Sequence, residues 1–223
     1  MTPEILVPKI LAPEIRRGRA DDADFIARII LLAQRGPKPL GWFDFALAQA
    51  EPQVHDFLKN LAVAQPRSWY HVSRFLIAEV EGHPAAALCA MPSRETRDTM
   101  RAAIEEVALA AGISGSDLAA IFTRGAYARA CWIQGGDEDW LIEHVASQPF
   151  ARGRGLVQAL IAQALAAGKA AGFERASITF LIGNEAAERC YAKAGFAFAE
   201  EKRDPAFEAL TGAPGFRRFA RAI

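Results

Sequence analysis

A glycine-rich turn at the start of the last third of the chain has the residue types of an anion-binding site. Arg152-Gly153-Arg154-Gly155 follows an apolar run and opens a run with helical spacing, Leu156–Ala167. Glycines at a helix start leave backbone N–H groups free and place no Cβ in a ligand's path. The pattern predicts a site for a pyrophosphate; the alternative is a plain turn with two solvated arginines.

Two other glycine-rich phosphate motifs fit this segment less well. A Walker loop requires Gly-Lys-Ser/Thr, which the segment lacks. A dinucleotide fingerprint requires a third glycine and usually opens near the N-terminus of its domain.

A second group of residues, further along the chain, combines a helix cap with a single phenol. Asn184 precedes a predicted short helix, Glu185–Lys193, and Gly195 ends it. Tyr191 stands one turn before that glycine. A phenol with a pKa of about 10 stays protonated at neutral pH and can act as a general acid. The alternatives are that Asn184 only caps the helix and that Tyr191 only fills space beneath a sheet.

The strand-like run before the glycine turn contains two titratable residues. Period-2 alternation predicts that Glu143, Val145 and Ser147 share one face of the strand. His144 and Ala146 then lie on the opposite face. Glu143 and His144 therefore point at one substrate only if a bulge interrupts the strand.

The two motifs together resemble the acyl-CoA site of the GNAT superfamily, the CoA-dependent N-acyltransferases. The family pattern Arg/Gln-x-x-Gly-x-Gly/Ala is met from Arg152 onward except at its last position, where Val157 has a β-branched side chain. The family spacing Asn…Ala…Tyr…Gly-Phe is met at each marked position, from Asn184 to Phe196. The resemblance covers roughly residues 14–91 and 138–200.

The resemblance implies roles for individual residues. Tyr191 would protonate the leaving thiolate, and Asn184 would bond the pantetheine arm of acetyl-CoA, the cosubstrate. A backbone N–H near Val145 would act as an oxyanion donor to the thioester carbonyl. The residues implied to bind the cofactor are Val145, Ser147, Arg152, Gly153, Arg154, Gly155, Leu156, Val157, Asn184 and Tyr191.

Acyl transfer to an amine also requires a base, because the acceptor amine is normally protonated. Glu143 is the first candidate, on the strand where many family members have a base or a water-holding polar group. His144 is the second candidate, and a bound water remains open. Either side chain is otherwise a polar group at a sheet edge or in the core. Aromatic residues that are candidates to line an acceptor pocket, or to pack in the core, are Trp132, Trp140 and Phe150.

The function implied is transfer of an acetyl group from acetyl-CoA to a primary amine by direct attack. A small amine, an antibiotic, a peptide N-terminus and a protein lysine all remain open as acceptors; the scattered acidic residues predict no strongly acidic cleft. One rival is a catalytically silent CoA-binding regulatory module, which would bind CoA without turnover. A second rival is an RNA- or protein-binding domain with a basic face, made by Arg152, Arg154, Arg217, Arg218 and Arg221.

Composition restricts the class of protein. With 223 residues, 52% hydrophobic and 23% charged, the chain has the composition of a soluble globular protein. The formal net charge of +0 indicates neither a nucleic-acid nor a membrane partner. Cys89, Cys131 and Cys190 are too widely spaced for a metal site or a disulfide framework, so we expect reduced thiols, a cytoplasmic location and no metal.

The spacing of apolar residues predicts the elements that position these groups. We expect one α/β (α+β) domain over residues 1–223, with a mixed, mostly antiparallel central sheet and helices on both faces. A helical insertion at 92–137 would shape the acceptor side or a dimer contact, or simply cover the core; a homodimer remains open. Apolar residues recur at helical spacing between Asp22 and Gly36 and in the segments 52–64, 94–111, 117–122, 156–167 and 185–193. Strand-like runs lie at 14–19, 74–80, 84–91, 141–146, 176–182, 196–200 and 216–222, with a loop at 205–215.

Overall fold

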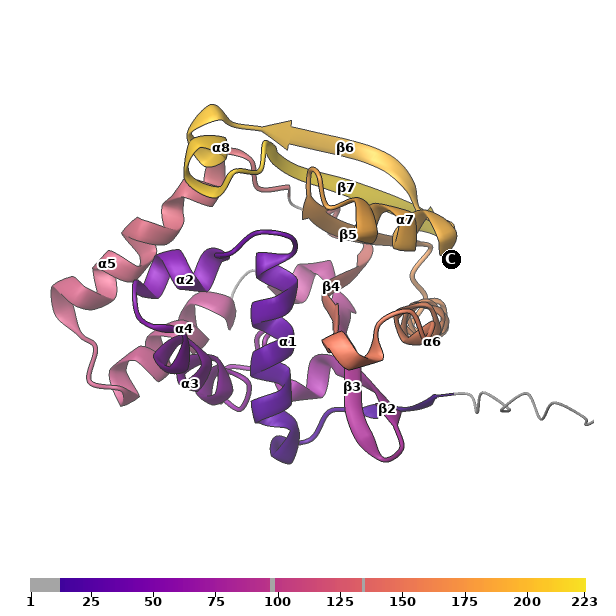
Figure 1. Ribbon diagram of the computed structural model, residues 1–223, viewed down its shortest axis with the longest axis horizontal. Coiled ribbons are helices and arrows are strands. Elements are labelled where there is room, and N and C mark those ends of the chain that lie inside the picture. The colour runs from indigo at the N-terminus through magenta and orange to yellow at the C-terminus, as the bar shows by residue number, and fades with distance from the viewer. Residues whose placement is uncertain (1–12, 97–98, 134) are drawn as a thin grey trace, which may run out of the picture.

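The computed structural model describes residues 13–96, 99–133 and 135–223, and within these a single seven-stranded sheet forms the centre of the molecule (Figure 1). Its strand order is β1-β2-β3-β4-β5-β7-β6. Every neighbouring pair is antiparallel except β4 and β5, which are parallel. The mixed, mostly antiparallel sheet that the sequence predicts is therefore confirmed. The strands are β1 (Glu14–Arg17), β2 (Phe75–Val80), β3 (His83–Pro92), β4 (Asp139–Ser147), β5 (Arg175–Leu181), β6 (Ala197–Arg203) and β7 (Gly215–Ala222).

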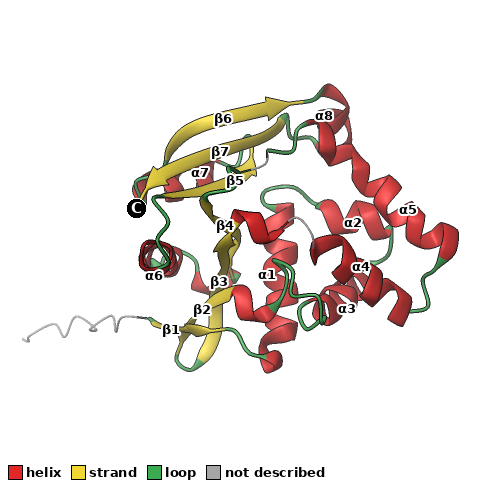
Figure 2. Ribbon diagram, turned by 180° about the vertical axis from the view of Figure 1, so that it is seen from behind, coloured by secondary structure: helices red, strands yellow, loops and turns green. Residues whose placement is uncertain are grey.

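Helices cover both faces of the sheet. Figure 2 shows α6 on one side of strands β2–β4 and α1, α3 and α4 on the other. The helices are α1 (Ala23–Arg35), α2 (Trp42–Leu47), α3 (Glu51–Leu61), α4 (Thr99–Ala110), α5 (Gly115–Gly125), α6 (Leu156–Ala170), α7 (Glu185–Lys193) and α8 (Pro205–Thr211).

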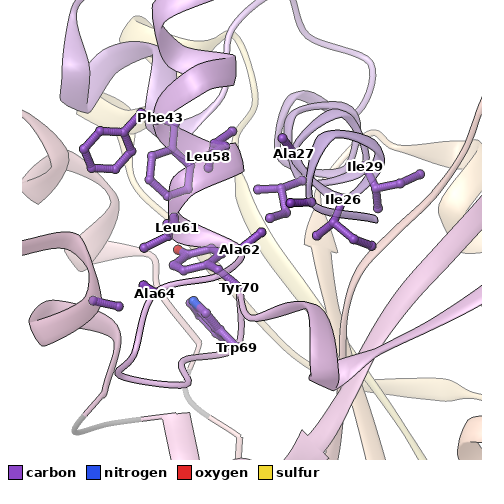
Figure 3. Close-up of a cluster of buried hydrophobic side chains, with 14 of the residues drawn as sticks. Ile26, Ala27, Ile29, Phe43, Leu58, Leu61, Ala62, Ala64, Trp69 and Tyr70 are labelled. Atoms are coloured by element: carbon purple, nitrogen blue, oxygen red, sulfur yellow. The ribbon is translucent and has the colours of Figure 1, made fainter. Parts of the chain in front are cut away.

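Two hydrophobic clusters, one on each face, hold these layers together. The first joins α1, α3 and α4 to the sheet and includes Ile26, Ile29 and Leu58, which are fully buried (Figure 3). The second joins α6 and α7 to the opposite face and includes Leu160 and Tyr191. Fully burying an aliphatic side chain of this size stabilises the fold by roughly 1.5–3 kcal/mol, so these clusters hold the helices against both faces of the sheet.

Strands β4 and β5 pair along only part of their length. Their parallel register runs from Asp139↔Arg175 to Ile142↔Ile178 and then stops. Both strands continue beyond it, β4 to Ser147 and β5 to Leu181. The unpaired ends leave an opening in the middle of the sheet.

Two predictions for connecting segments are corrected. The loop predicted at 205–215 contains helix α8, whose first turn is capped by the Asp204 carboxylate, which accepts a hydrogen bond from the Phe207 N–H at 2.7 Å. A short helix, α2, also forms where no helix was predicted; the Asp44 carboxylate accepts a hydrogen bond from the Gly41 N–H at 2.8 Å. Side-chain capping makes both helices possible despite their length.

The segment predicted as a helical insertion contains α4, α5 and a 3₁₀ turn, Ala126–Ala130. Helix α4 packs on α3, and α5 packs on α2. Residues 97–98 and 134 of the segment, and residues 1–12 of the predicted domain, lie outside the described residues. That the segment is an insertion in a single domain stays a prediction.

Among the helices of the described residues, none combines the length and the apolar character needed to cross a bilayer.

Candidate active site

A cavity of about 1090 Å³ lies at the opening between β4 and β5. The ends of both strands line it, together with the glycine-rich turn and one side of α7. The cavity then continues past β4 to the side covered by α1, α2 and α5. It thus has two arms that meet at β4, and each arm is lined by a different part of the chain.

The glycine-rich turn forms the mouth of the first arm. Gly153 and Gly155 have φ of 77° and 76°, a left-handed conformation that glycine adopts without strain. Gly155 is the N-cap of α6, and the first helical hydrogen bond runs from the Ala159 N–H to its carbonyl at 3.1 Å. The N–H groups of Leu156 and Val157 precede that bond and are free to bind an anion at the positive end of the helix. Arg152 and Arg154 are exposed beside them.

Val157, the departure from the family pattern, lies half-buried on the first turn of α6. Its side chain packs against the second hydrophobic cluster and also lines the cavity. Part of its β-branched bulk is therefore accommodated by the core.

Asn184 and Tyr191 lie on the opposite wall of the first arm, on α7. The Asn184 side-chain oxygen accepts a hydrogen bond from the Ala187 N–H at 3.2 Å, so Asn184 caps the helix. Its amide nitrogen faces the end of α1, where a Cβ added at Gly36 would lie 3.1 Å from it. Tyr191 is buried and packs edge-on against Phe180 at 5.4 Å. Burial raises the pKa of the Tyr191 phenol, so it remains protonated at neutral pH.

A β-bulge in β4 changes which way its side chains point. Ala87 pairs with Ala146 and Cys89 with Glu143, so three steps along β4 oppose two along β3. His144, at the bulge, adopts a left-handed backbone conformation, with φ of 50°. The predicted alternation across this stretch is therefore wrong: Glu143 pairs with Cys89 of the first cluster, while Val145 packs on the second. Paired residues of antiparallel strands point to the same face.

The bulge brings Glu143 and His144 to the same side of the sheet. The His144 ring lies 5.5 Å from that of Trp69 and 5.1 Å from that of Tyr70, both in the first cluster. Burial lowers the pKa of His144 to about 3, so the imidazole is neutral. Burial raises the pKa of Glu143 to about 8, so the carboxyl is mostly protonated at neutral pH and becomes a carboxylate as the pH approaches and passes 8.

All the residues predicted to bind the cofactor or to act in catalysis line this one cavity, as do His144 and Trp132. Trp140 and Phe150 do not; Trp140 packs against Phe173 at 5.2 Å in the second cluster, and Phe150 is 57% exposed. Sequence reasoning missed Gln34, Trp69 and Tyr70, which line the second arm. These three are distant in sequence from either motif, and no local pattern connects them to the site.

The arginines of the proposed basic face are largely occupied. Arg217 pairs with Glu188 at 2.9 Å and with Glu201 at 2.8 Å, and Arg218 pairs with Glu200 at 2.9 Å. Arg221 donates a hydrogen bond to the carbonyl of Ala194. These pairs neutralise the face that a nucleic-acid partner would need.

Histidine, cysteine, aspartate and glutamate side chains do not gather in threes anywhere in residues 13–96, 99–133 and 135–223 in a way that could hold a metal ion.

A comparison with protein families gives a match to a segment that includes part of the cavity lining. Residues 125–196, from the end of α5 to the residue after Gly195, match the model of the Acetyltransferase (GNAT) family. A comparison with curated proteins found no match.

Solved structures share the fold. One protein described as an acetyltransferase superposes with a TM-score of 0.68 at 18% identity, covering 94% of this chain and 99% of that chain. An N-acetyltransferase from Staphylococcus aureus Mu50 gives 0.67 at 19% identity, covering 93% and 100%. A polyamine N-acetyltransferase from Drosophila melanogaster, which forms N-acetylagmatine, gives 0.54 at 15% identity, covering 95% and 100%. At these identities the likeness is one of fold.

Proposed function

We propose that the chain is a GNAT-type acetyltransferase, and that it transfers an acetyl group from acetyl-CoA to a primary amine by direct attack; the match of residues 125–196 to the Acetyltransferase (GNAT) family and the shared fold support this. The observation that carries the proposal is the single cavity between β4 and β5. It joins a glycine-rich anion site, a buried phenol and a carboxyl of raised pKa. Together these groups supply what acyl transfer to an amine requires: an anchor for the cosubstrate, an acid and a base.

The cosubstrate would bind in the first arm. The free N–H groups at the start of α6 and the exposed Arg152 and Arg154 would hold the pyrophosphate by charge-assisted bonds. The Asn184 amide would meet the pantetheine arm while its oxygen continues to cap α7. The end of β4 that no longer pairs with β5, with Val145 and Ser147, would lie along the same arm, and its N–H near Val145 would stabilise the oxyanion.

In the chemical step, Glu143 would take a proton from the acceptor ammonium, directly or through a water. The amine nitrogen would then attack the thioester carbonyl, forming the C–N bond. The C–S bond would break, and the Tyr191 phenol would give its proton to the leaving thiolate. The nitrogen would lose its second proton to the Tyr191 phenolate, directly or through water, which leaves a neutral amide and restores the phenol. His144 is a poorer base than Glu143, because burial lowers its pKa to about 3.

The test is release of the CoA thiol from acetyl-CoA by the purified chain with a panel of primary amines. We expect turnover with at least one amine and loss of most of it in Glu143→Gln. Tight binding of acetyl-CoA with no turnover by any small amine, peptide or protein lysine would instead favour the silent CoA-binding module.

A further inference from the structure

We propose that the second arm of the cavity binds the acceptor, and that the acceptor is a monoamine with an aromatic ring bearing an uncharged polar group. This inference rests on the proposed acetyl transfer and names the class of its second substrate. It follows from three features of the arm: the charges that line it, its aromatic walls and its unpartnered polar atoms.

The charges of the lining exclude a polycation. Among the described residues that line the cavity, Glu143 is the only carboxylate. The lining cations are Lys38, Arg129, Arg152, Arg154 and Lys193. A di- or polyamine that places one amine at Glu143 leaves its other ammonium groups without a counter-ion, and burying an unpaired charge is costly. The acceptor is therefore expected to have one amine and an uncharged body.

The walls of the arm are aromatic. Trp69 stands edge-on to Trp132 at 5.7 Å, and His144 lies between Trp69 and Tyr70. Trp132 is 38% exposed, whereas Trp69 and Tyr70 are buried. An arm closed by buried rings, with a partly exposed ring at its side, fits a flat apolar body.

Unpartnered polar atoms point to a polar group on that body. The Trp69 Nε1, the Gln34 Oε1 and the His144 Nε2 are buried and form no hydrogen bond of good geometry, and all three residues line the cavity. The Tyr70 hydroxyl lies close enough to the Trp69 and Gln34 side chains to interact with both. Trp69 and His144 are each only 7% exposed. In Figure 3 the Trp69 nitrogen and the Tyr70 hydroxyl oxygen lie on the same side, away from Ile26 and Ile29 of α1.

A ligand hydroxyl beside that of Tyr70 satisfies two of these three atoms, because it accepts from the indole N–H of Trp69 and donates to the amide oxygen of Gln34. Leaving buried polar atoms without partners is unfavourable, so a site of this kind discriminates against ligands that lack the group. The body is therefore predicted to carry a neutral donor–acceptor group such as a hydroxyl.

The experiment compares three amines as acceptors with saturating acetyl-CoA: tyramine, phenethylamine and spermidine. Tyramine has the ring and the hydroxyl, phenethylamine has only the ring, and spermidine has additional ammonium groups. We expect kcat/KM for tyramine to exceed that for spermidine by at least about tenfold and to exceed that for phenethylamine.

Two tryptophan variants test the role of the indole nitrogen. Trp69→Phe removes the unpartnered N–H in the arm while keeping a ring. Trp140→Phe removes another buried, unpartnered indole N–H, on a residue that does not line the cavity. We expect the ratio of kcat/KM for tyramine over phenethylamine to fall to about one in Trp69→Phe and to stay unchanged in Trp140→Phe. Melting temperatures of both variants check that each is folded at the assay temperature.

Three results would each overturn the inference: kcat/KM for spermidine as high as that for tyramine, the same tyramine-to-phenethylamine ratio in the two variants, or turnover of another primary amine but of neither ring-bearing amine. Failure of the proposed function would look different, because acetyl-CoA would then be cleaved with no amine at all, whether or not it shifts the melting temperature.

Discussion

At the residue scale, Glu143 and His144 are adjacent in the chain, yet burial moves their pKa values in opposite directions. A carboxylic acid is neutral when protonated and an imidazole is neutral when deprotonated, so desolvation raises one pKa and lowers the other. The pKa of Glu143 rises to about 8 and that of His144 falls to about 3. Only Glu143 therefore changes its charge in the range where an amine acetyltransferase would work.

The first prediction concerns the pH dependence of turnover. If Glu143 is the base, kcat/KM of the wild type should rise with pH until about 8, because the carboxyl must be deprotonated. Glu143→Gln should lose roughly 100-fold in kcat/KM at about pH 8 and lack the levelling near pH 8, keeping only the rise that comes from deprotonation of the amine itself. His144→Asn, whose new side chain tolerates a left-handed backbone, should keep the levelling near pH 8 even if its rate is lower. Levelling near pH 8 that survives in Glu143→Gln would remove Glu143 as the base.

The second prediction concerns the pH dependence of the protein's stability, which also follows from the raised pKa of Glu143. The folded-state pKa of Glu143 lies above the unfolded value of 4.5, so the folded protein holds a proton that the unfolded chain releases. The stability of the wild type should fall as pH rises from about 4.5 to about 8 and level off above. Glu143→Gln removes this loss, so its melting temperature relative to wild type should increase across that window. A difference that does not vary with pH would contradict the raised pKa.

The third prediction concerns the acid. Tyr191→Phe keeps the ring that packs on Phe180 and removes only the hydroxyl. It should bind acetyl-CoA as the wild type does and transfer the acetyl group roughly 100-fold more slowly. An unchanged transfer rate would remove Tyr191 from the mechanism.

At the element scale, the start of α6 depends on glycine for its conformation. Gly155 and Gly172 lie at opposite ends of the helix, with φ of 76° and 84°, and a Cβ at either position would meet nothing within 4 Å. Substitution at either position therefore strains the backbone without a clash. A left-handed non-glycine residue costs roughly 1–2 kcal/mol.

The fourth prediction uses this pair. Gly155→Ala and Gly172→Ala should lose similar stability in denaturant unfolding, about 1 kcal/mol each. Only Gly155→Ala should weaken acetyl-CoA binding, measured by titration calorimetry, because only Gly155 lies at the proposed pyrophosphate site. Equal affinities in the two variants would mean that the turn does not bind the cosubstrate.

Local signals explain which elements the sequence could predict. The start of α7 was predictable, because Asn184 is a strong N-cap and Gly195 a strong stop. Helix α2 was not, since its six residues gain stability from packing against α5, which is distant in sequence. The bulge at His144 has no glycine or proline to mark it, so alternation alone gave the wrong face for Val145.

At the scale of the whole molecule, the site exists because β4 and β5 pair at one end and separate at the other. Asp139, 1% exposed, lies at the paired end, where its carboxylate contacts Arg175 of β5 at 2.5 Å and Arg218 of β7 at 3.8 Å. Both cofactor motifs could be recognised from the sequence because each is contiguous. The second arm could not, because Gln34 and Trp69 meet His144 only through the packing of the folded chain.

The fifth prediction tests whether Asp139 holds β4 and β5 together at their paired end. Asp139→Ala removes the buried carboxylate that contacts Arg175 and Arg218, and it should lower the free energy of unfolding by roughly 1.5–3 kcal/mol. Glu185→Ala breaks an exposed pair with Arg189 and should cost much less. Denaturant midpoints compare the two, and equal losses would mean that Asp139 does not hold the strands together.

The central claim is that the opening between β4 and β5 binds acetyl-CoA, and thermal unfolding with and without acetyl-CoA tests it most directly. Ligand at about 100 times its dissociation constant adds roughly 2.7 kcal/mol, and each kcal/mol raises the melting temperature of a domain of this size by roughly 2–4 °C, so the protein should melt about 5–11 °C higher. We expect that shift in the wild type, and a smaller one in Gly155→Ala at the same ligand concentration. No shift of the wild type at millimolar acetyl-CoA would contradict the account.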